Sequence, residues 1–186
     1  MGPPGSGKGT QAEHIARRFG IPAISTGDLF RAHVRDKTEL GVEASGYMDH
    51  GEFVPDHVTT AMLRRRLEEE DASEGFLLDG YPRTVIQIGA LDEMLADRQQ
   101  TLEVVLELTA PDHELVSRML LRAQEQGRAD DTEPVIQRRL ELYRAETQPV
   151  LTAYSQRGIL LTVDGSGERE TITKAAVAAL EGALAG

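Results

Sequence analysis

The segment Met1-Gly-Pro-Pro-Gly-Ser-Gly-Lys-Gly-Thr10, at the start of the chain, decides the fold. It nearly matches G-x-x-x-x-G-K-[ST], a glycine-rich loop that cradles phosphate, except that Gly9 separates Lys8 from the hydroxyl of Thr10. Glycines let backbone N–H groups approach phosphate oxygens, and the helix predicted over residues 8–19 adds the positive potential of its N-terminus. Residues 2–10, the phosphate loop, are therefore predicted to bind a phosphorylated ligand.

Such a loop is expected to follow a β-strand, yet only Met1 precedes Gly2 in this sequence. We expect that the first strand of the fold is missing from the sequence, through a truncated or mis-called start. One alternative is therefore a chain that folds poorly and is inactive, because neighbouring strands lose their partners and buried unpaired amides cost about 1–3 kcal/mol each.

Beyond the loop, short apolar runs alternate with amphipathic stretches, which is the pattern of βα units around a parallel sheet. The predicted strands are residues 22–25, 76–79, 101–108 and 159–163. The longest predicted helix is continuous over residues 134–157, and Thr26–Asp28 are expected to cap another. The prediction is one doubly wound α/β core over residues 1–186, with helices on both faces of the sheet and two small mobile inserts, 25–54 and 122–133.

The amino-acid composition excludes several classes of function. The 31 acidic residues outnumber the 20 basic ones, giving a net charge of −11, which argues against a general binder of nucleic acid or membrane surfaces. The chain has no cysteine, which excludes disulfides, Cys-ligated zinc and a cysteine nucleophile. No apolar run approaches the roughly 18 residues of a membrane span, and no signal peptide is evident. We expect a cytoplasmic monomer that acts on small molecules.

The apolar run Phe76-Leu-Leu-Asp79 supplies a second motif. A buried strand that ends in a carboxylate beside a phosphate loop can orient Mg²⁺ and its waters. Asp79 is therefore the candidate Mg²⁺ residue, acting through water, and the hydroxyl of Thr10 is a second candidate.

Five segments together resemble the adenylate kinase family, in the family's order from residue 2 to about 167. They are GPPGSGKGTQ (2–11), STGDLFR (25–31), DGYPRT (79–84), GRADD (127–131) and VDG (163–165). The short, cysteine-free lid resembles the form of the family without zinc. The resemblance implies reversible phosphoryl transfer from Mg²⁺-bound ATP to AMP, giving two ADP, with residues 25–54 as the AMP-binding insert and 122–133 as the lid.

The resemblance also implies roles for residues at matching positions. Those expected to bind ATP are Gly5, Ser6, Gly7, Lys8, Gly9, Thr10, Arg118, Arg122 and Gly167. Those expected at the AMP site are Thr26, Arg31, Glu52, Phe53, Val54, Gly80, Tyr81, Pro82, Arg83, Gln87, Arg128 and Arg139. Those expected to act on the transferring phosphoryl group are Lys8, Arg83, Arg118, Arg122, Arg128 and Arg139.

The chemistry of the residues agrees with this expectation. A phosphate oxygen of AMP is already anionic at neutral pH, so no general base is needed, and positioning with charge neutralisation can supply the catalysis. Arg118 and Arg122 are spaced i, i+4 and share one helix face. Closure of the lid would bring them together with Arg128 and Arg139 and exclude water, which suppresses hydrolysis of ATP.

Two other functions are weighed against this one. A related kinase that acts on UMP or CMP is disfavoured by Thr26 and Gln87, because pyrimidine-specific relatives tend to carry other residues there. A GTP-driven switch would need the guanine-reading N-K-x-D motif, and the chain contains no asparagine.

Overall fold

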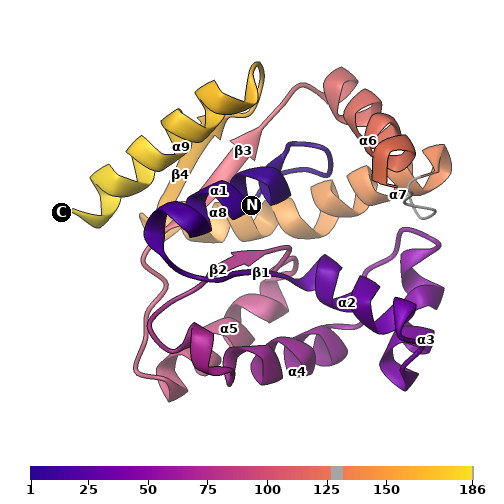
Figure 1. Ribbon diagram of the computed structural model, residues 1–186, viewed down its shortest axis with the longest axis horizontal. Coiled ribbons are helices and arrows are strands. Elements are labelled where there is room, and N and C mark those ends of the chain that lie inside the picture. The colour runs from indigo at the N-terminus through magenta and orange to yellow at the C-terminus, as the bar shows by residue number, and fades with distance from the viewer. Residues whose placement is uncertain (127–131, 186) are drawn as a thin grey trace.

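The computed structural model describes residues 1–126 and 132–185, and these form a mixed α/β fold rich in helices (Figure 1). The strands in the described residues are β1 (Ala23–Ser25), β2 (Leu77–Asp79), β3 (Val105–Thr109) and β4 (Leu160–Asp164). The helices before β3 are α1 (Lys8–Phe19), α2 (Thr26–Arg35), α3 (Glu39–Met48), α4 (Asp56–Leu67), the 3₁₀ turn η1 (Glu70–Ala72) and α5 (Val85–Asp97). Those after β3 are α6 (Asp112–Gln126), α7 (Glu133–Leu142), the π-turn η2 (Tyr143–Thr147), α8 (Gln148–Gln156) and α9 (Arg169–Leu184).

The strands form two parallel pairs, β1 with β2 and β3 with β4. This differs from the single sheet predicted, because no ladder joins the two pairs within the described residues. Met1 nevertheless pairs with β3: its amine donates to the Leu106 carbonyl, and its own carbonyl accepts from Leu108 N at 3.0 Å. That is the bonding of a parallel neighbour strand, and Figure 1 draws the N-terminus between the two pairs.

Helices cover both faces of the strands, as predicted. Side chains alternate along a strand, so Leu77, Leu106 and Leu161 face α1 and α9, in a cluster with Ile15 and Leu180.

The opposite face of the strands packs on other helices. Ile24 and Leu78 pack against apolar side chains of α4 and α5, and Val105 and Leu160 pack with Tyr154 of α8. Each pair is parallel, so the carboxyl ends of β1 and β2 lie at one edge, where the segments 25–31 and 79–84 follow them.

One predicted strand boundary was wrong, and one predicted helix has an irregular turn. The strand expected at 101–108 begins only at Val105, because its partner β4 starts at Leu160 after the turn at Gly158. The helix expected at 134–157 is continuous from Glu133 to Gln156, but it contains a π-turn, η2, that was not predicted. Pro149 is the second residue after η2, and proline removes a helical N–H and crowds the carbonyl four residues earlier, that of Ala145 within η2, which accounts for the π-turn.

The predicted insert 25–54 forms α2 and α3, which pack together around Phe30 and Ala44. Met62 of α4 joins this cluster, so α4 is part of the same packing unit. Helix α2 is capped by Ser25, whose hydroxyl accepts from Asp28 N at 3.3 Å, rather than by Thr26–Asp28 as expected. Of the helices described, none combines the length and the apolar character that crossing a membrane requires.

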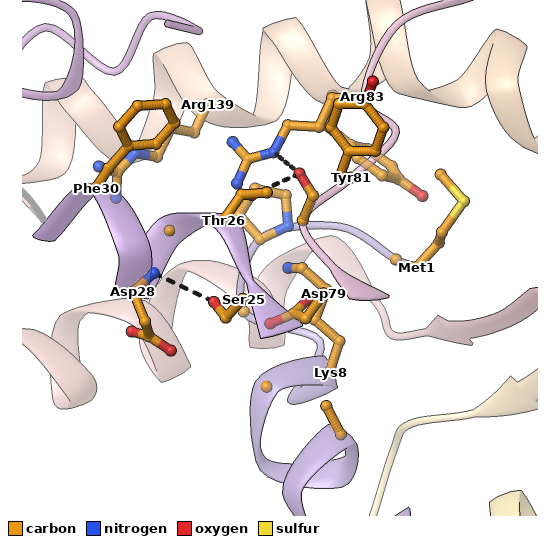
Figure 2. A pocket seen from close by; sticks show the side chains of 18 of the residues that line it. Met1, Lys8, Ser25, Thr26, Asp28, Phe30, Asp79, Tyr81, Arg83 and Arg139 are labelled. Carbon is orange, nitrogen blue, oxygen red and sulfur yellow. Dashed lines mark hydrogen bonds between the residues drawn. The ribbon is translucent and has the colours of Figure 1, made fainter. Parts of the chain in front are cut away.

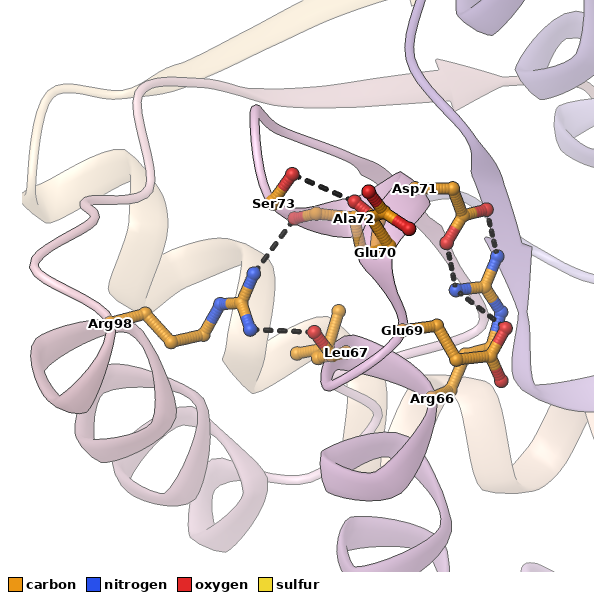
Figure 3. A network of polar contacts seen from close by, with 8 residues as sticks. All are labelled: Arg66, Leu67, Glu69, Glu70, Asp71, Ala72, Ser73 and Arg98. Atoms are coloured by element: carbon orange, nitrogen blue, oxygen red, sulfur yellow. Dashed lines mark hydrogen bonds and ion pairs between the residues drawn. The ribbon is translucent and has the colours of Figure 1, made fainter.

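Hydrogen bonds and ion pairs hold the segment between α4 and β2 in place (Figure 3). The guanidinium of Arg98 donates to the carbonyls of Leu67 at 2.5 Å and Ala72 at 2.8 Å, and so caps the ends of α4 and η1. Arg66 forms a two-bond ion pair with Asp71 at 2.8 and 2.7 Å. The network fixes the path of the chain into β2, whose last residue is Asp79.

Candidate active site

Most of the predicted site residues line one cleft of about 580 Å³ at the carboxyl ends of β1 and β2. In a parallel α/β fold this is where ligands bind. The predicted residues that line it are Gly5, Gly7, Lys8, Gly9, Thr10, Thr26, Arg31, Glu52, Phe53, Val54, Asp79, Gly80, Tyr81, Pro82, Arg83, Gln87, Arg118, Arg122 and Arg139. Ser6 and Gly167 do not line it, and Arg128 lies outside the described residues.

The phosphate loop leads into α1 with no side chain capping the helix. Gly7 occupies the N-cap position with φ of 86°, so the first amides of α1 are left available to an anion. Gly5 has φ of 86°, and a Cβ there would lie 2.6 Å from the Leu115 carbonyl oxygen. Only glycine therefore fits at this close approach of the loop to α6.

Lys8 stands at the head of α1 in a strongly cationic region. Burial lowers the pKa of Lys8 to about 8, Asp79 opposes this shift, and the charges of Arg83, Arg122 and Arg139 add to it. Its Nζ donates to the Pro3 carbonyl at 3.4 Å, a long bond that a stronger acceptor can replace. These groups come from α1, the loop after β2, α6 and α7, so the fold gathers them around one space.

Asp79 lies between the phosphate loop and β1. It is paired in register with Ser25, and its Oδ2 would lie 3.4 Å from a Cβ on Gly9. Figure 2 shows its carboxylate beside Lys8. Asp79 and Thr10 both line the cleft, and carboxylate and hydroxyl oxygens suit Mg²⁺, which keeps several waters and binds substrate phosphates. Among the described residues no group of three or more His, Cys, Asp or Glu is placed to hold a metal ion.

The loop after β2 is built around the carbonyl of Gly80 (Figure 2). Thr26 Oγ1 donates to it at 2.9 Å and Arg83 Nε at 2.8 Å. Gly80 has φ of 84°, and a Cβ there would meet Thr26 Oγ1 at 2.7 Å. The guanidinium of Arg83 lies over the Phe53 ring, 5.2 Å from its centroid. Burial lowers the pKa of Arg83, and its neighbours Arg139 and Arg31 contribute in the same direction.

The remaining predicted arginines reach the cleft from different elements. Arg118 donates to the Gly165 carbonyl at 3.0 Å and to Glu114 at 2.6 Å, which ties α6 to the loop after β4. Arg31 forms an ion pair with Asp28 at 2.5 Å. Arg122 and Arg139 line the cleft from α6 and α7.

The cleft also contains residues that the sequence did not single out, including Tyr143, Thr147 and Arg169. Thr147 is buried, and its Oγ1 donates to the Arg83 carbonyl at 2.9 Å. It belongs to the π-turn η2, which no motif predicted. The sequence carries no signal for this contact, because the two residues lie 64 positions apart.

Comparison with known proteins places the chain in a family. The family model described as adenylate kinase matches residues 1–159. The adenylate kinase of Kocuria rhizophila is 58% identical over 181 residues, covering 97% of this chain and 96% of that protein. The adenylate kinase of Pseudarthrobacter chlorophenolicus is 56% identical over 185 residues, covering 100% and 96% respectively. The adenylate kinase of Thermobifida fusca is 50% identical over 181 residues, with coverage of 97% and 96%. The chain therefore belongs to the adenylate kinase family.

Proposed function

We propose that this ATP:AMP phosphotransferase carries out phosphoryl transfer in the cleft between the phosphate loop and the loop after β2. The observation that carries the proposal is the gathering of Lys8, Arg83, Arg122 and Arg139 from four separate elements around one space. The charges of Arg83, Arg122 and Arg139 disfavour the protonated form of Lys8, and a polyphosphate spanning the cleft would supply negative charge that favours it.

The two nucleotides have distinct places in this proposal. The phosphate loop, Arg118 and Arg122 form the ATP side, where the first amides of α1, which no side chain caps, can bind the phosphates. Gly167 does not line the cleft, so its contact with ATP would lie at the edge of this site. The insert 25–54 and the loop after β2 form the AMP side, where the Arg83 guanidinium is held by Gly80 and Phe53. The proposed lid, 122–133, includes residues 127–131, which lie outside the described part of the chain.

The residues favour a mechanism of positioning. The attacking phosphate oxygen is an anion at neutral pH, so the protein has to hold two negatively charged groups together and neutralise the charge that spreads over the transferred group. Four cationic side chains that line the cleft can neutralise this charge: Lys8, Arg83, Arg122 and Arg139. Asp79 and Thr10 would hold Mg²⁺, which supplies charge neutralisation on the ATP phosphates when bound.

We also propose that one further apolar strand belongs between β2 and β3. Met1 already makes the two hydrogen bonds of a parallel neighbour to β3, and its amine is close enough to Asp79 to feel that charge. A strand there would join the two pairs into one sheet directly behind the phosphate loop.

A coupled assay of ADP formation tests the function. We expect ADP only when ATP, AMP and Mg²⁺ are all present, and we expect CMP and UMP to be poor acceptors. Hydrolysis of GTP without an acceptor, or faster turnover with CMP or UMP than with AMP, would overturn the proposal.

A further inference from the structure

The amide of Gln87 is held from both ends. Its Oε1 accepts from Arg83 N at 2.7 Å, and its Nε2 donates to Asp56 Oδ1 at 2.6 Å. Gln87 is only 2% exposed, yet it lines the cleft. Asp56 itself does not line the cleft, so its carboxylate meets the amide from behind.

These partners permit one orientation of the amide. A backbone N–H can only donate and an ionised carboxylate can only accept, so Oε1 must face Arg83 N and Nε2 must face Asp56. If the amide turned by 180°, its Nε2 would face the Arg83 N–H, which is also a donor, and its Oε1 would face the Asp56 carboxylate, which is also an acceptor. The orientation therefore follows from the chemistry of the partners.

Asp56 is in turn held in place by the start of α5. Thr84 caps α5 by accepting from Gln87 N at 3.3 Å, and its Oγ1 donates to Asp56 Oδ2 at 3.0 Å. Asp56 is also the first residue of α4, where a negative side chain is favourable. Both carboxylate oxygens are thus engaged, and the carboxylate cannot turn without losing one of these bonds.

We propose that Asp56 is a positioning residue that locks the Gln87 amide and thereby sets the preference for 6-amino over 6-oxo purine monophosphates. This rests on the proposed function, in which Gln87 belongs to the AMP site. The locked amide keeps one N–H on Nε2 and one lone pair on Oε1 for a ligand. Adenine offers a complementary acceptor at N1 and donor at N6, whereas hypoxanthine offers a donor at N1 and an acceptor at O6. A freed amide that turns over can match hypoxanthine.

The test compares AMP with inosine monophosphate as acceptors for ATP, by kcat/KM. Asp56→Ala is expected to lower the AMP-to-IMP preference by about tenfold, since a site built to hydrogen-bond one edge loses its discrimination when the bond is released. Asp56→Asn keeps an oxygen for Nε2 and is expected to stay within about threefold of the unaltered preference. KM for ATP should change little in either variant.

The matched control is Asp92→Ala. Like Asp56, Asp92 accepts two side-chain hydrogen bonds, in this case from Arg157 at 2.9 and 2.7 Å, but Asp92 lies outside the cleft. This control should leave the AMP-to-IMP preference unchanged, even where its melting temperature falls. If Asp56→Ala does not fold, Asp56→Ser replaces it, because serine suits a helix start but is too short to reach Gln87.

The outcomes separate the two proposals. An unaltered enzyme that makes no ADP from ATP and AMP would overturn the proposed function, whatever the variants do. An active enzyme whose AMP-to-IMP preference stays the same in Asp56→Ala would overturn the role of Asp56 alone. A parallel loss with AMP, IMP and ATP would also overturn it, because that pattern indicates a general structural defect.

Discussion

Lys8 is the residue whose charge the cleft controls most directly. Burial brings the pKa of Lys8 down to about 8, so its ammonium group loses a proton as the pH rises from 7 to 9. Bound phosphate favours the charged form, which means that ATP binding must take up a proton in this range. We expect the Kd for ATP to rise between pH 7 and pH 9.

The variant Lys8→Met removes this group and should abolish turnover while the melting temperature stays the same or increases, because a buried charge is lost. The variant should bind ATP more weakly than the unaltered protein, but its Kd for ATP should not rise between pH 7 and pH 9. Titration calorimetry at both pH values measures the effect, and near-normal activity of the variant would contradict the role of Lys8.

Arg83 supports a prediction about the acceptor. Its guanidinium is positioned by the Gly80 carbonyl and the Phe53 ring, on the side of the cleft proposed for AMP. Arg83→Ala should lower kcat by at least about 100-fold and leave ATP affinity within about threefold, because the group acts mainly in the transition state. Steady-state kinetics with both substrates varied measures the split. The control Arg35→Ala removes an exposed arginine paired with its neighbour Asp36 and should change neither value.

Among the contacts between helices, we expect the hydrogen bonds of Arg98 to the ends of α4 and η1 to contribute most to the stability of this segment. Arg98→Ala leaves the carbonyls of Leu67 and Ala72 without this donor and should destabilise the fold by about 1–3 kcal/mol. Arg66→Ala, in the same network, removes an ion pair with the exposed Asp71 and should destabilise the fold less than Arg98→Ala does, because water screens exposed ion pairs. Urea unfolding measures both. Equal losses would show that Arg98 is no more than a surface ion-pair partner.

Across the whole molecule, we expect stability to depend on how Met1 is held beside β3. Burial lowers the pKa of the Met1 amine to about 6, so between pH 6 and pH 8 the unfolded chain binds more protons than the folded one. The free energy of unfolding is therefore highest, with respect to this amine, above pH 8, where the amine is neutral in both states. That stability is lost as the pH falls through 6, where the buried amine becomes charged.

An extension of about five apolar residues before Met1 would replace the amine with a peptide bond and supply the proposed strand. We expect the melting temperature to rise by several degrees, and the difference from the unextended chain to be larger at pH 6 than at pH 8. Calorimetry at both pH values is the measurement, and a polar extension of equal length is the control. Equal melting temperatures for the apolar and polar extensions would refute the proposed strand.

Much of the architecture was readable in the sequence because it depends on local patterns. The glycines and Lys8 of residues 2–10 indicated the phosphate loop, and alternating apolar runs indicated strands and helices to within a few residues. The wrong strand boundary lies where a distant partner decides, because residues 101–104 have β propensity but no partner strand in the described residues. The π-turn η2 has a local cause instead, Pro149 within a long helix.

The sequence by itself determined the family, the phosphate loop and the set of arginines, because each is written in contiguous motifs. Folding alone brought Asp56 against Gln87 and Thr147 against Arg83, since these partners lie 31 and 64 positions apart. The physical reason is that a motif records the backbone conformation of neighbouring residues. A hydrogen bond between distant side chains exists only after packing has brought two elements together.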